Sequence, residues 1–413
     1  MDPQPSRNSR LIVQKYGGTS VGTPERIRAV ADRIAQARKA GHDLVVVVSA
    51  MGHTTDELID LAHQVAREPQ HREMDMLLTA GERISMALLS MALHERGVPA
   101  LSFTGSQTGI ITDTAHRRAR IKRILGDRVR QAIATGHVAI VAGFQGVSET
   151  KEITTLGRGG SDTTAVALAA ALGAAACEIY TDVNGVYSAD PRVVSEAKLF
   201  RKIPHDLMVE LATRGAGVLH PRSVELAKQF VVPLRVLNSL NQDEGTWVME
   251  RKNMGPNTAM EEFRVTGVTS DKGRMLLRVE LERATVVTAI WDRATKAHLS
   301  MVAPFFADSK MAFYVERDAE NEWRALLQDL AYQGFVRSYD LEAGLAPVSV
   351  VGDRFSQDGA ALGEIMETLA SSGISVTMGS ASALALTVAV PTGRLDEAVK
   401  ALHQKLIEGE KAK

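Results

Sequence analysis

From residue 10 to about residue 250, short apolar runs alternate with longer stretches whose apolar residues recur at helical spacing. The apolar runs predict strands at Leu11–Lys15, Leu44–Ser49, Ala100–Thr104, His137–Ala142, Glu178–Thr181 and Leu234–Leu237. The amphipathic stretches predict helices at Pro24–Ala40, Asp56–Ala66, Leu77–Glu95, Arg118–Thr135, Ser161–Leu172 and Pro221–Phe230. This alternation is typical of βαβ units, so we expect a three-layer αβα domain of the α/β class around a mainly parallel sheet.

A polar segment from Glu250 to Phe263, with Gly255 and Pro256 inside it, favours a domain boundary. Two further blocks follow, and each shows the order strand, helix, strand, strand, helix of a ferredoxin-like βαββαβ unit. We therefore predict three domains, at residues 1–255, 264–342 and 343–413.

Composition narrows the classes of partner. The 413 residues carry a formal net charge of −1, and no basic run is interleaved with aromatics, which disfavours nucleic acid. The single cysteine, Cys177, rules out an intramolecular disulfide and a cysteine-based zinc site, so we expect a cytoplasmic protein. The longest apolar run, Ala165 to Cys177, is shorter than the ~20 residues that cross a bilayer. We interpret that run as a buried helix and expect no membrane partner.

The first motif that indicates chemistry lies at Lys15–Val21, where a predicted strand runs into Gly17, Gly18 and a pair of hydroxyl residues. Glycines let the backbone approach a ligand closely, and the N–H groups at the start of the following helix suit an anion. Lys15 adds a positive charge at the end of the strand. Taken alone, the motif fits a tight turn with an exposed lysine equally well.

The second motif is the glycine-rich stretch Thr154–Thr164, which leads directly into an alanine-rich predicted helix. Three glycines, an arginine able to clamp a carboxylate, and an aspartate at the helix start together indicate a pre-organised polar pocket. Helix capping explains Ser161 or Asp162, but it does not explain Arg158 among three glycines.

The third motif, Thr181–Arg192, follows a predicted strand and is dense in turn-forming residues. Alone it would be an ordinary surface loop. Beside the two glycine loops, its hydroxyl, carboxylate, ring and guanidinium groups fit the carboxyl edge of an open α/β sheet, where nucleotides bind. The Walker pattern G-x-x-x-x-G-K-S/T, the protein-kinase H-R-D and D-F-G sets, and a G-x-G-x-x-G after a strand are all absent.

In this order, the motifs resemble those of the aspartate kinases of the amino-acid kinase family, which carry C-terminal ACT domains. The resemblance covers about residues 11–240. It rests on Lys15–Val21, Val48–Met51, Thr55–Leu58, Leu78–Arg83, Phe103–Gly105, Ala142–Gly146, Gly157–Thr164 and Thr181–Arg192. It implies the three-layer amino-acid kinase fold followed by two ferredoxin-like ACT domains.

The resemblance further implies ATP-dependent phosphorylation of the β-carboxylate of L-aspartate to 4-phospho-L-aspartate, the entry step to lysine, threonine and methionine. By position it makes Lys15 and Asp162 catalytic, with Lys15 on the transferring phosphoryl group and Asp162 orienting it. It assigns the aspartate to Ser49, Thr55, Glu82 and Arg158. It assigns ATP, with Mg²⁺ held mainly through the phosphates, to Lys15, Gly17, Gly18, Ser20, Ser161, Thr181, Asp182, Tyr187 and Arg192.

These roles also make chemical sense. A carboxylate is already nucleophilic at neutral pH, so the protein needs to position two anions and spread the charge of the transition state. Glu82 and Arg158 can pair with the ammonium and α-carboxylate groups of an amino acid. None of His42, His53, His63 and His71 has metal-ligand spacing with a carboxylate, so we predict no protein-held metal.

The chain departs from the family at two places. Relatives carry a nucleotide-binding lysine where this chain has Gly217, for which Arg214, Arg222 and Lys228 are candidate substitutes. The amide and carboxylate positions that ACT domains use for effectors are missing from Leu281–Thr285, His298–Met301 and Gly373–Thr377. We therefore expect the ACT pair to serve a homodimer or homotetramer, with weak or absent feedback by lysine and threonine.

Two other functions stay open. The chain is compatible with another amino-acid kinase, acting on glutamate, N-acetylglutamate or carbamate, although the ACT-like blocks and the motif at Glu82 disfavour it. The change at Gly217 also permits a catalytically impaired paralogue that acts as a regulatory or assembly subunit.

Overall fold

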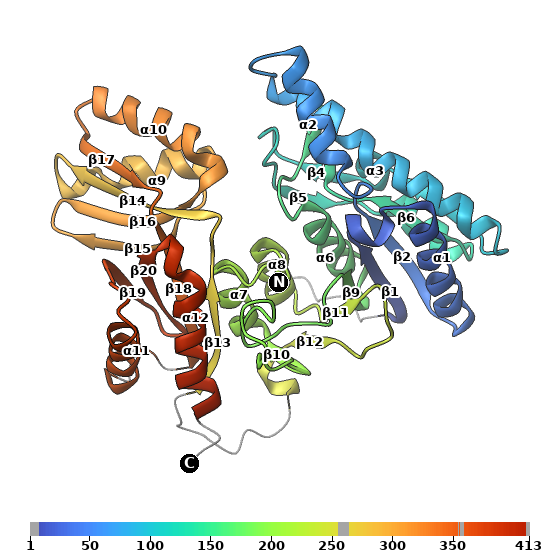
Figure 1. The fold of residues 1–413 in the computed structure, drawn as a ribbon. Helices are drawn as coiled ribbons and strands as arrows, with labels where there is room; N and C mark the ends of the chain where they lie inside the picture. Colours follow the sequence, from blue (N-terminus) through green and yellow to red (C-terminus); the bar gives the residue numbers. More distant parts are fainter. Residues whose placement is uncertain (1–7, 255–263, 354, 356–358, 410–413) are drawn as a thin grey trace. The chain divides into compact units, whose positions relative to one another are not determined.

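The computed structural model describes residues 8–254, 264–353, 355 and 359–409 (Figure 1). Most of the predicted boundary at Glu250–Phe263 lies outside the described residues. Unit 1 comprises Met1–Val186, Leu199–Asp206 and Val218–Gly255. Unit 2 comprises Tyr187–Lys198, Leu207–Gly217 and Pro256–Lys413. Two segments of the predicted first domain, residues 187–198 and 207–217, therefore pack with the C-terminal unit.

Unit 1 is built on an eight-stranded sheet of order β10-β12-β11-β9-β1-β2-β6-β3. The strands are β1 (Asn8–Tyr16), β2 (Asp43–Val48), β3 (Ala100–Phe103), β6 (Val138–Ala142), β9 (Ala174–Thr181), β10 (Lys202–Pro204), β11 (Leu234–Asn238) and β12 (Thr246–Met249). All neighbours pair in parallel except β11 and β12. The predicted α/β class and mainly parallel sheet are confirmed.

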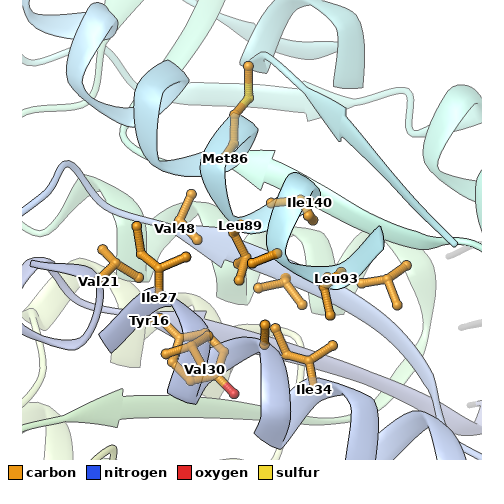
Figure 2. Close-up of a cluster of buried hydrophobic side chains, with 14 of the residues drawn as sticks. Tyr16, Val21, Ile27, Val30, Ile34, Val48, Met86, Leu89, Leu93 and Ile140 are labelled. Carbon is orange, nitrogen blue, oxygen red and sulfur yellow. The ribbon is translucent and has the colours of Figure 1, made fainter. Parts of the chain in front are cut away.

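Helices cover both faces of this sheet. They are α1 (Pro24–Lys39), α2 (Thr54–Val65), α3 (His71–His94), α5 (Asp127–Ala134), α6 (Gly160–Leu172) and α8 (Pro221–Gln229). Figure 2 shows Ile27 and Ile34 of α1 and Leu89 of α3 meeting on side chains such as Val48 of the sheet. Because successive strand residues alternate between faces, Lys15 points away from the side on which Tyr16 is buried.

Two helix predictions were wrong. The predicted helix Arg118–Thr135 is a strand, β5 (Ile121–Ile124), followed by α5, because Gly126 takes a left-handed conformation between them. The apolar run Ala165–Cys177 is not one helix: α6 ends at Leu172 and β9 begins at Ala174. Gly173, with φ 65°, ends the helix, and small apolar residues alone do not distinguish a buried helix from a buried strand.

The sequence pattern did not predict a second, small sheet in unit 1. Its order is β5-β4-β7-β8, with β4 (Ile110–Thr112), β7 (Gln145–Ser148) and β8 (Ile153–Thr155). Strands of three and four residues are too short to show a clear period. Their position matters, because β8 leads directly into the glycine-rich loop before α6.

Among the described helices, α3 meets the length and composition criteria for a membrane span. The relevant window is 44% buried, and the helix also buries the carboxylates of Asp75 and Glu82. Its apolar side packs into the core through Leu89 and Leu93, so composition alone is weak evidence for a membrane span here.

Unit 2 contains two four-stranded antiparallel sheets, β15-β16-β14-β17 and β13-β18-β20-β19. The strands are β13 (Arg264–Ser270), β14 (Arg274–Leu281), β15 (Val302–Ala307), β16 (Lys310–Glu316), β17 (Val336–Glu342), β18 (Leu345–Asp353), β19 (Met378–Ala381) and β20 (Ala385–Pro391). The helices are α9 (Val287–Lys296), α10 (Glu320–Tyr332), α11 (Gly359–Ser371) and α12 (Leu395–His403). β13 falls in the predicted range 264–342, yet it pairs with β18 of the following block.

Candidate active site

A cavity of about 290 Å³ opens in unit 1 at the carboxyl ends of β1 and β2. It is lined by Lys15, Gly18, Ser49, Ala50, Gly52, Thr55, Glu82, Phe144, Gly157, Arg158, Gly159, Gly160, Ser161 and Asp162. Every residue predicted to be catalytic or to bind aspartate is in this list. The two glycine loops, far apart in sequence, therefore meet at one cavity.

Lys15 and Asp162 form the charged pair of the cavity. Lys15 Nζ lies 2.6 Å from Asp162 Oδ1, and both side chains are largely buried, with relative exposures of 13% and 12%. Lys15 stands near the end of β1, and Asp162 lies in the first turn of α6, where the helix dipole favours a negative charge. The carboxylate thus fixes the ammonium group at the cavity wall.

Glu82 brings a buried carboxylate to the same cavity. Its side chain is 3% exposed, and Oε1 accepts a hydrogen bond from the backbone N–H of Ala50 at 3.3 Å. Among the described residues, Oε2 has no hydrogen-bond partner. Burial raises the pKa of Glu82 to about 7, against a smaller lowering by the backbone hydrogen bonds. A cation bound in the cavity would satisfy the unpartnered oxygen.

Gly81 explains how Glu82 reaches this place. A Cβ atom added at Gly81 would lie 2.7 Å from the Cβ of Ala50, so only glycine allows α3 to approach so closely. This contact explains why the Thr79–Glu82 stretch, which carried part of the family resemblance, contains a glycine.

The loop before α6 needs its glycines for both conformation and space. Gly157 and Gly159 have φ of 75° and 68°, and a Cβ at Gly159 would lie 2.1 Å from the His220 ring. The loop delivers Arg158 and the first turn of α6 to the cavity. A guanidinium and the free N–H groups of a helix start together suit an anion such as a carboxylate or phosphate.

The turn after β1 is equally tight. A Cβ at Gly18 would lie 2.9 Å from the carbonyl oxygen of Ala50. Ser20 is 2% exposed, and its hydroxyl has no hydrogen-bond partner among the described residues. Gly17 and Ser20 belong to the same turn as Gly18 but are not among the residues that line the cavity.

The structure divides the predicted nucleotide residues between the two units. In unit 1, Thr181 ends β9 and Asp182 follows it, and the Thr181 hydroxyl donates to Asp182 at 3.1 Å. Tyr187 and Arg192 belong to unit 2, where Arg192 pairs with Asp190 at 2.8 Å. The Arg192 guanidinium holds the pKa of Asp190 below its usual range.

Two of the residues named as substitutes for the lysine that relatives carry at position 217 make other contacts in the structure. Arg214, 8% exposed, pairs with Glu210 and donates to the Thr387 hydroxyl. Arg222 donates to the carbonyl oxygens of Leu156 and Ala119 at 2.6 and 3.1 Å. Gly217 itself has φ 68°, which favours glycine at that position.

Six residues that line the cavity were not among the predicted site residues: Ala50, Gly52, Phe144, Gly157, Gly159 and Gly160. Phe144 has a φ of 67°, a strained conformation for a residue other than glycine. Phe144 lies just beyond β6 in the Ala142–Gly146 motif, which carried part of the family resemblance but no predicted role. The backbone N–H of Phe144 donates to the Thr164 hydroxyl at 3.2 Å, which ties this turn to α6.

The sequence of this chain matches the models of two protein families. The sequence model described as the amino acid kinase family matches residues 10–238, and one described as an ACT domain matches residues 348–406. The chain therefore belongs to the amino acid kinase family.

Curated relatives narrow the assignment. The aspartokinase of Geobacillus stearothermophilus is 45% identical over 399 residues, covering 95% of this chain and 96% of the relative. The aspartokinase of Corynebacterium glutamicum is 44% identical over 407 residues, covering 96% of each. Within its family, this chain belongs with the aspartokinases.

Solved structures support the same grouping. E. coli aspartokinase III in complex with aspartate and ADP, in the R-state, gives a TM-score of 0.83 at 25% identity, covering 96% of this chain and 99% of that chain. The aspartate kinase from Synechocystis gives a TM-score of 0.54 at 40% identity, covering 96% of this chain and 69% of that chain.

Proposed function

We propose that this chain transfers the terminal phosphoryl group of ATP to the β-carboxylate of L-aspartate in the cavity of unit 1. The observation that carries the proposal is the meeting of the Lys15–Asp162 pair, Glu82 and Arg158 around one cavity. Two groups of opposite charge recognise the two ends of an amino acid, and a buried ammonium group stands beside them.

In the proposed reaction, a β-carboxylate oxygen of aspartate attacks the γ-phosphorus of ATP. A new C–O–P bond forms, the bond between the γ-phosphorus and the β–γ bridging oxygen breaks, and ADP leaves with that oxygen. The carboxylate is already ionised, so no protein group needs to take a proton from it. Catalysis then depends on position and on charge stabilisation.

Lys15 carries the positive charge that stabilises the transferring phosphoryl group, and Asp162 holds its ammonium group in place. Glu82 binds the substrate ammonium through its unpartnered oxygen, and Arg158 binds the α-carboxylate, with Ser49 and Thr55 beside them. The glycines at 17 and 18, together with Ser20 and Ser161, surround the phosphates. Thr181, Asp182, Tyr187 and Arg192 bind the rest of ATP.

Mg²⁺ bound with ATP neutralises phosphate charge during the transfer. We assign it mainly to the phosphate oxygens. The Ser20 hydroxyl, which has no partner among the described residues, can donate a hydrogen bond to a phosphate oxygen or accept one from a water bound to Mg²⁺.

We also propose that the enzyme is a cytoplasmic homo-oligomer, a dimer or tetramer, that pairs through its ACT-like domains. β15 is an edge strand, and its Phe305 and Phe306 are 46% and 42% exposed. Exposed apolar edge strands readily pair with a second chain.

Feedback by lysine and threonine is weak or absent, because the effector positions of the ACT blocks are replaced. Half-maximal inhibition at sub-millimolar lysine plus threonine would refute this.

The function is tested by measuring ADP release with L-aspartate, L-glutamate, N-acetyl-L-glutamate and carbamate as acceptors, with hydroxylamine to trap the acyl phosphate. We expect turnover and a trapped hydroxamate with L-aspartate alone. Preferred use of another acceptor would favour the other amino-acid kinases. Calorimetry that detects binding of neither an ATP analogue nor aspartate would instead identify an inert subunit.

A further inference from the structure

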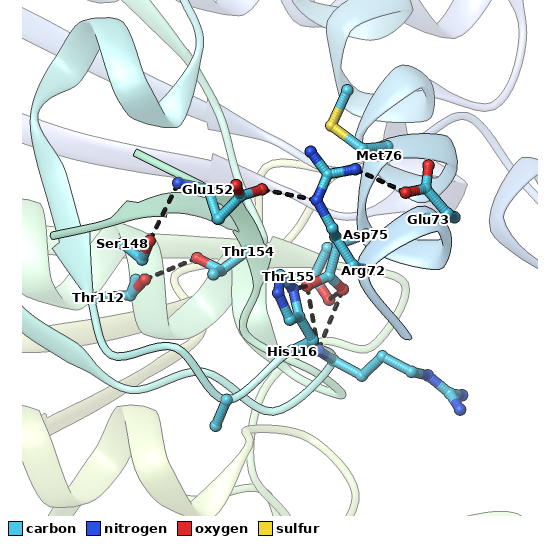
Figure 3. A network of polar contacts seen from close by, with 12 residues as sticks. Arg72, Glu73, Asp75, Met76, Thr112, His116, Ser148, Glu152, Thr154 and Thr155 are labelled. Atoms are coloured by element: carbon cyan, nitrogen blue, oxygen red, sulfur yellow. Dashed lines mark hydrogen bonds and ion pairs between the residues drawn. The ribbon is translucent and has the colours of Figure 1, made fainter. Parts of the chain in front are cut away.

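A second buried carboxylate on α3 lies outside the cavity. Asp75 is 0% exposed, and its two oxygens accept hydrogen bonds from the Thr155 hydroxyl at 2.6 Å and from the backbone N–H of Arg117 at 3.0 and 3.2 Å. Nδ1 of His116 lies 2.6 Å from Oδ2 (Figure 3). A buried carboxyl group is stable only when it is well hydrogen-bonded, so these contacts hold Asp75 in one position.

The partners of Asp75 lead to the substrate loop. Thr155 ends β8, and Gly157 and Arg158 follow it almost directly. Arg117 belongs to the loop between β4 and β5, and its carbonyl oxygen would lie 2.7 Å from a Cβ added at Gly157. Asp75 therefore holds the strand that carries the glycine loop and, separately, the backbone against which that loop rests.

Further bonds complete this support. The backbone N–H of Ala119 donates to the Thr155 carbonyl at 2.9 Å. Arg222, at the start of α8, donates to both Ala119 and Leu156, and Leu156 is fully buried. Residues 155 and 156, just before Gly157, are thus held by hydrogen bonds from Ala119 and Arg222. These bonds fix the start of the loop that carries Arg158.

The same helix also presents Glu82, about two turns beyond Asp75. We infer that Asp75, with Thr155 and His116 as its partners, is a positioning residue that sets Arg158 at the correct separation from Glu82 for binding L-aspartate. Glu82 meets the substrate directly, whereas Asp75 acts through the loop. This inference rests on the proposed function.

Asp75→Asn tests it. The amide keeps the shape of the side chain but has one acceptor oxygen in place of two, so it cannot hold Thr155, Arg117 and His116 as the carboxylate does. We expect the KM for aspartate to rise at least about tenfold while the KM for ATP stays within about twofold. Glu152→Gln is the matched control, because Glu152 pairs with Arg72 on the surface nearby, and we expect no change in either KM.

Thr155→Val and Thr155→Ser keep the test decisive if Asp75→Asn does not fold. Valine preserves the shape and removes the donor, whereas serine keeps it, so valine raises the KM for aspartate several-fold and serine restores it. Equal effects of the two variants, or a parallel rise in both KM values, would overturn the inference. Wild-type turnover with aspartate is measured first; its absence would overturn the proposed function and this inference together, whereas normal turnover with indifferent variants would overturn the inference alone.

Discussion

The cavity proposed to bind aspartate and the segment that carries Tyr187 and Arg192 are anchored in different units. All the residues that line the cavity belong to unit 1. Residues 187–198 instead pack with the C-terminal unit, where the backbone N–H of Val268 donates to the Ser188 carbonyl at 2.8 Å. Changes in the C-terminal unit are therefore expected to reach ATP binding more easily than aspartate binding.

His403 is the clearest link of this kind. It ends α12, is 0% exposed, and places Nε2 2.9 Å from the Ser188 hydroxyl, 215 residues away in sequence. Its Nδ1 lies 2.8 Å from the Glu408 carboxylate. Lys198 donates through Nζ to the carbonyl of Ile407 at 3.0 Å, so both ends of the 187–198 segment contact the C-terminal helix region.

The largest effect should come from unit 1, at Lys15. Lys15→Ala removes the positive charge proposed to stabilise the transferring phosphoryl group, so we expect kcat to fall by about 10²–10³-fold. Steady-state kinetics with both substrates would measure this, and the thermal transition would verify folding. A loss below about tenfold would contradict the role assigned to Lys15.

The next effect concerns the protonation of Glu82. Its pKa is raised to about 7, and in the proposed complex only the ionised carboxylate attracts the substrate ammonium. The KM for aspartate should therefore fall as pH rises from about 6 to about 8, since a proton is lost from the site over that window. Glu82→Gln should raise this KM about tenfold and remove its pH dependence.

The same pKa predicts an opposite trend for the stability of the ligand-free enzyme. A carboxyl group whose pKa is raised in the folded state stabilises that state at low pH, and this contribution is lost as pH rises through about 7. Above that pH, Glu82→Gln should unfold at a higher denaturant concentration than the wild type, by a free energy on the order of 3 kcal/mol. A variant less stable than the wild type at about pH 8 would argue against a strained, buried charge at this position.

The smallest effect should come from unit 2. His403→Gln weakens the link to Ser188, so we expect the KM for ATP to rise about threefold to fivefold while the KM for aspartate is unchanged. Initial rates at varied ATP and at varied aspartate would separate the two. Lys405→Gln, on the surface of the same region, serves as the control. A rise confined to the KM for aspartate would contradict the expectation that unit 2 acts on ATP binding.

Sequence pattern predicted the parts that depend on local chemistry. β1, β2 and β6 are nearly continuous apolar runs because both of their faces are covered, and their positions were predicted closely. The two glycine loops were recognisable because few residues other than glycine fit such turns. Arg158 stood out by its place among three glycines, whereas Glu82 came from the family resemblance, and the structure places both at the cavity lined by the two loops.

The sequence pattern did not predict which distant strands pair or which distant residues form hydrogen bonds. A repeated βαββαβ pattern does not say that β13 pairs with β18 rather than with a strand of the nearer block. Nothing in the residues around Asp75 or His403 marks Thr155 or Ser188 as their partners. Periodicity reports which face of an element is apolar, but it carries no information about which distant polar group completes a buried hydrogen bond.

The positions of tight turns, the buried runs and the available charged residues can be predicted from local sequence, because they follow from side-chain size, polarity and backbone freedom. Which of those charged residues meet depends on the packing of distant segments. The ion pair of Lys15 and Asp162, and the assignment of residues 187–198 to the C-terminal unit, depend on how far-separated segments pack together. Buried polar groups in folded proteins mostly find hydrogen-bond partners, and such partners often lie far away along the chain, where no local pattern identifies them.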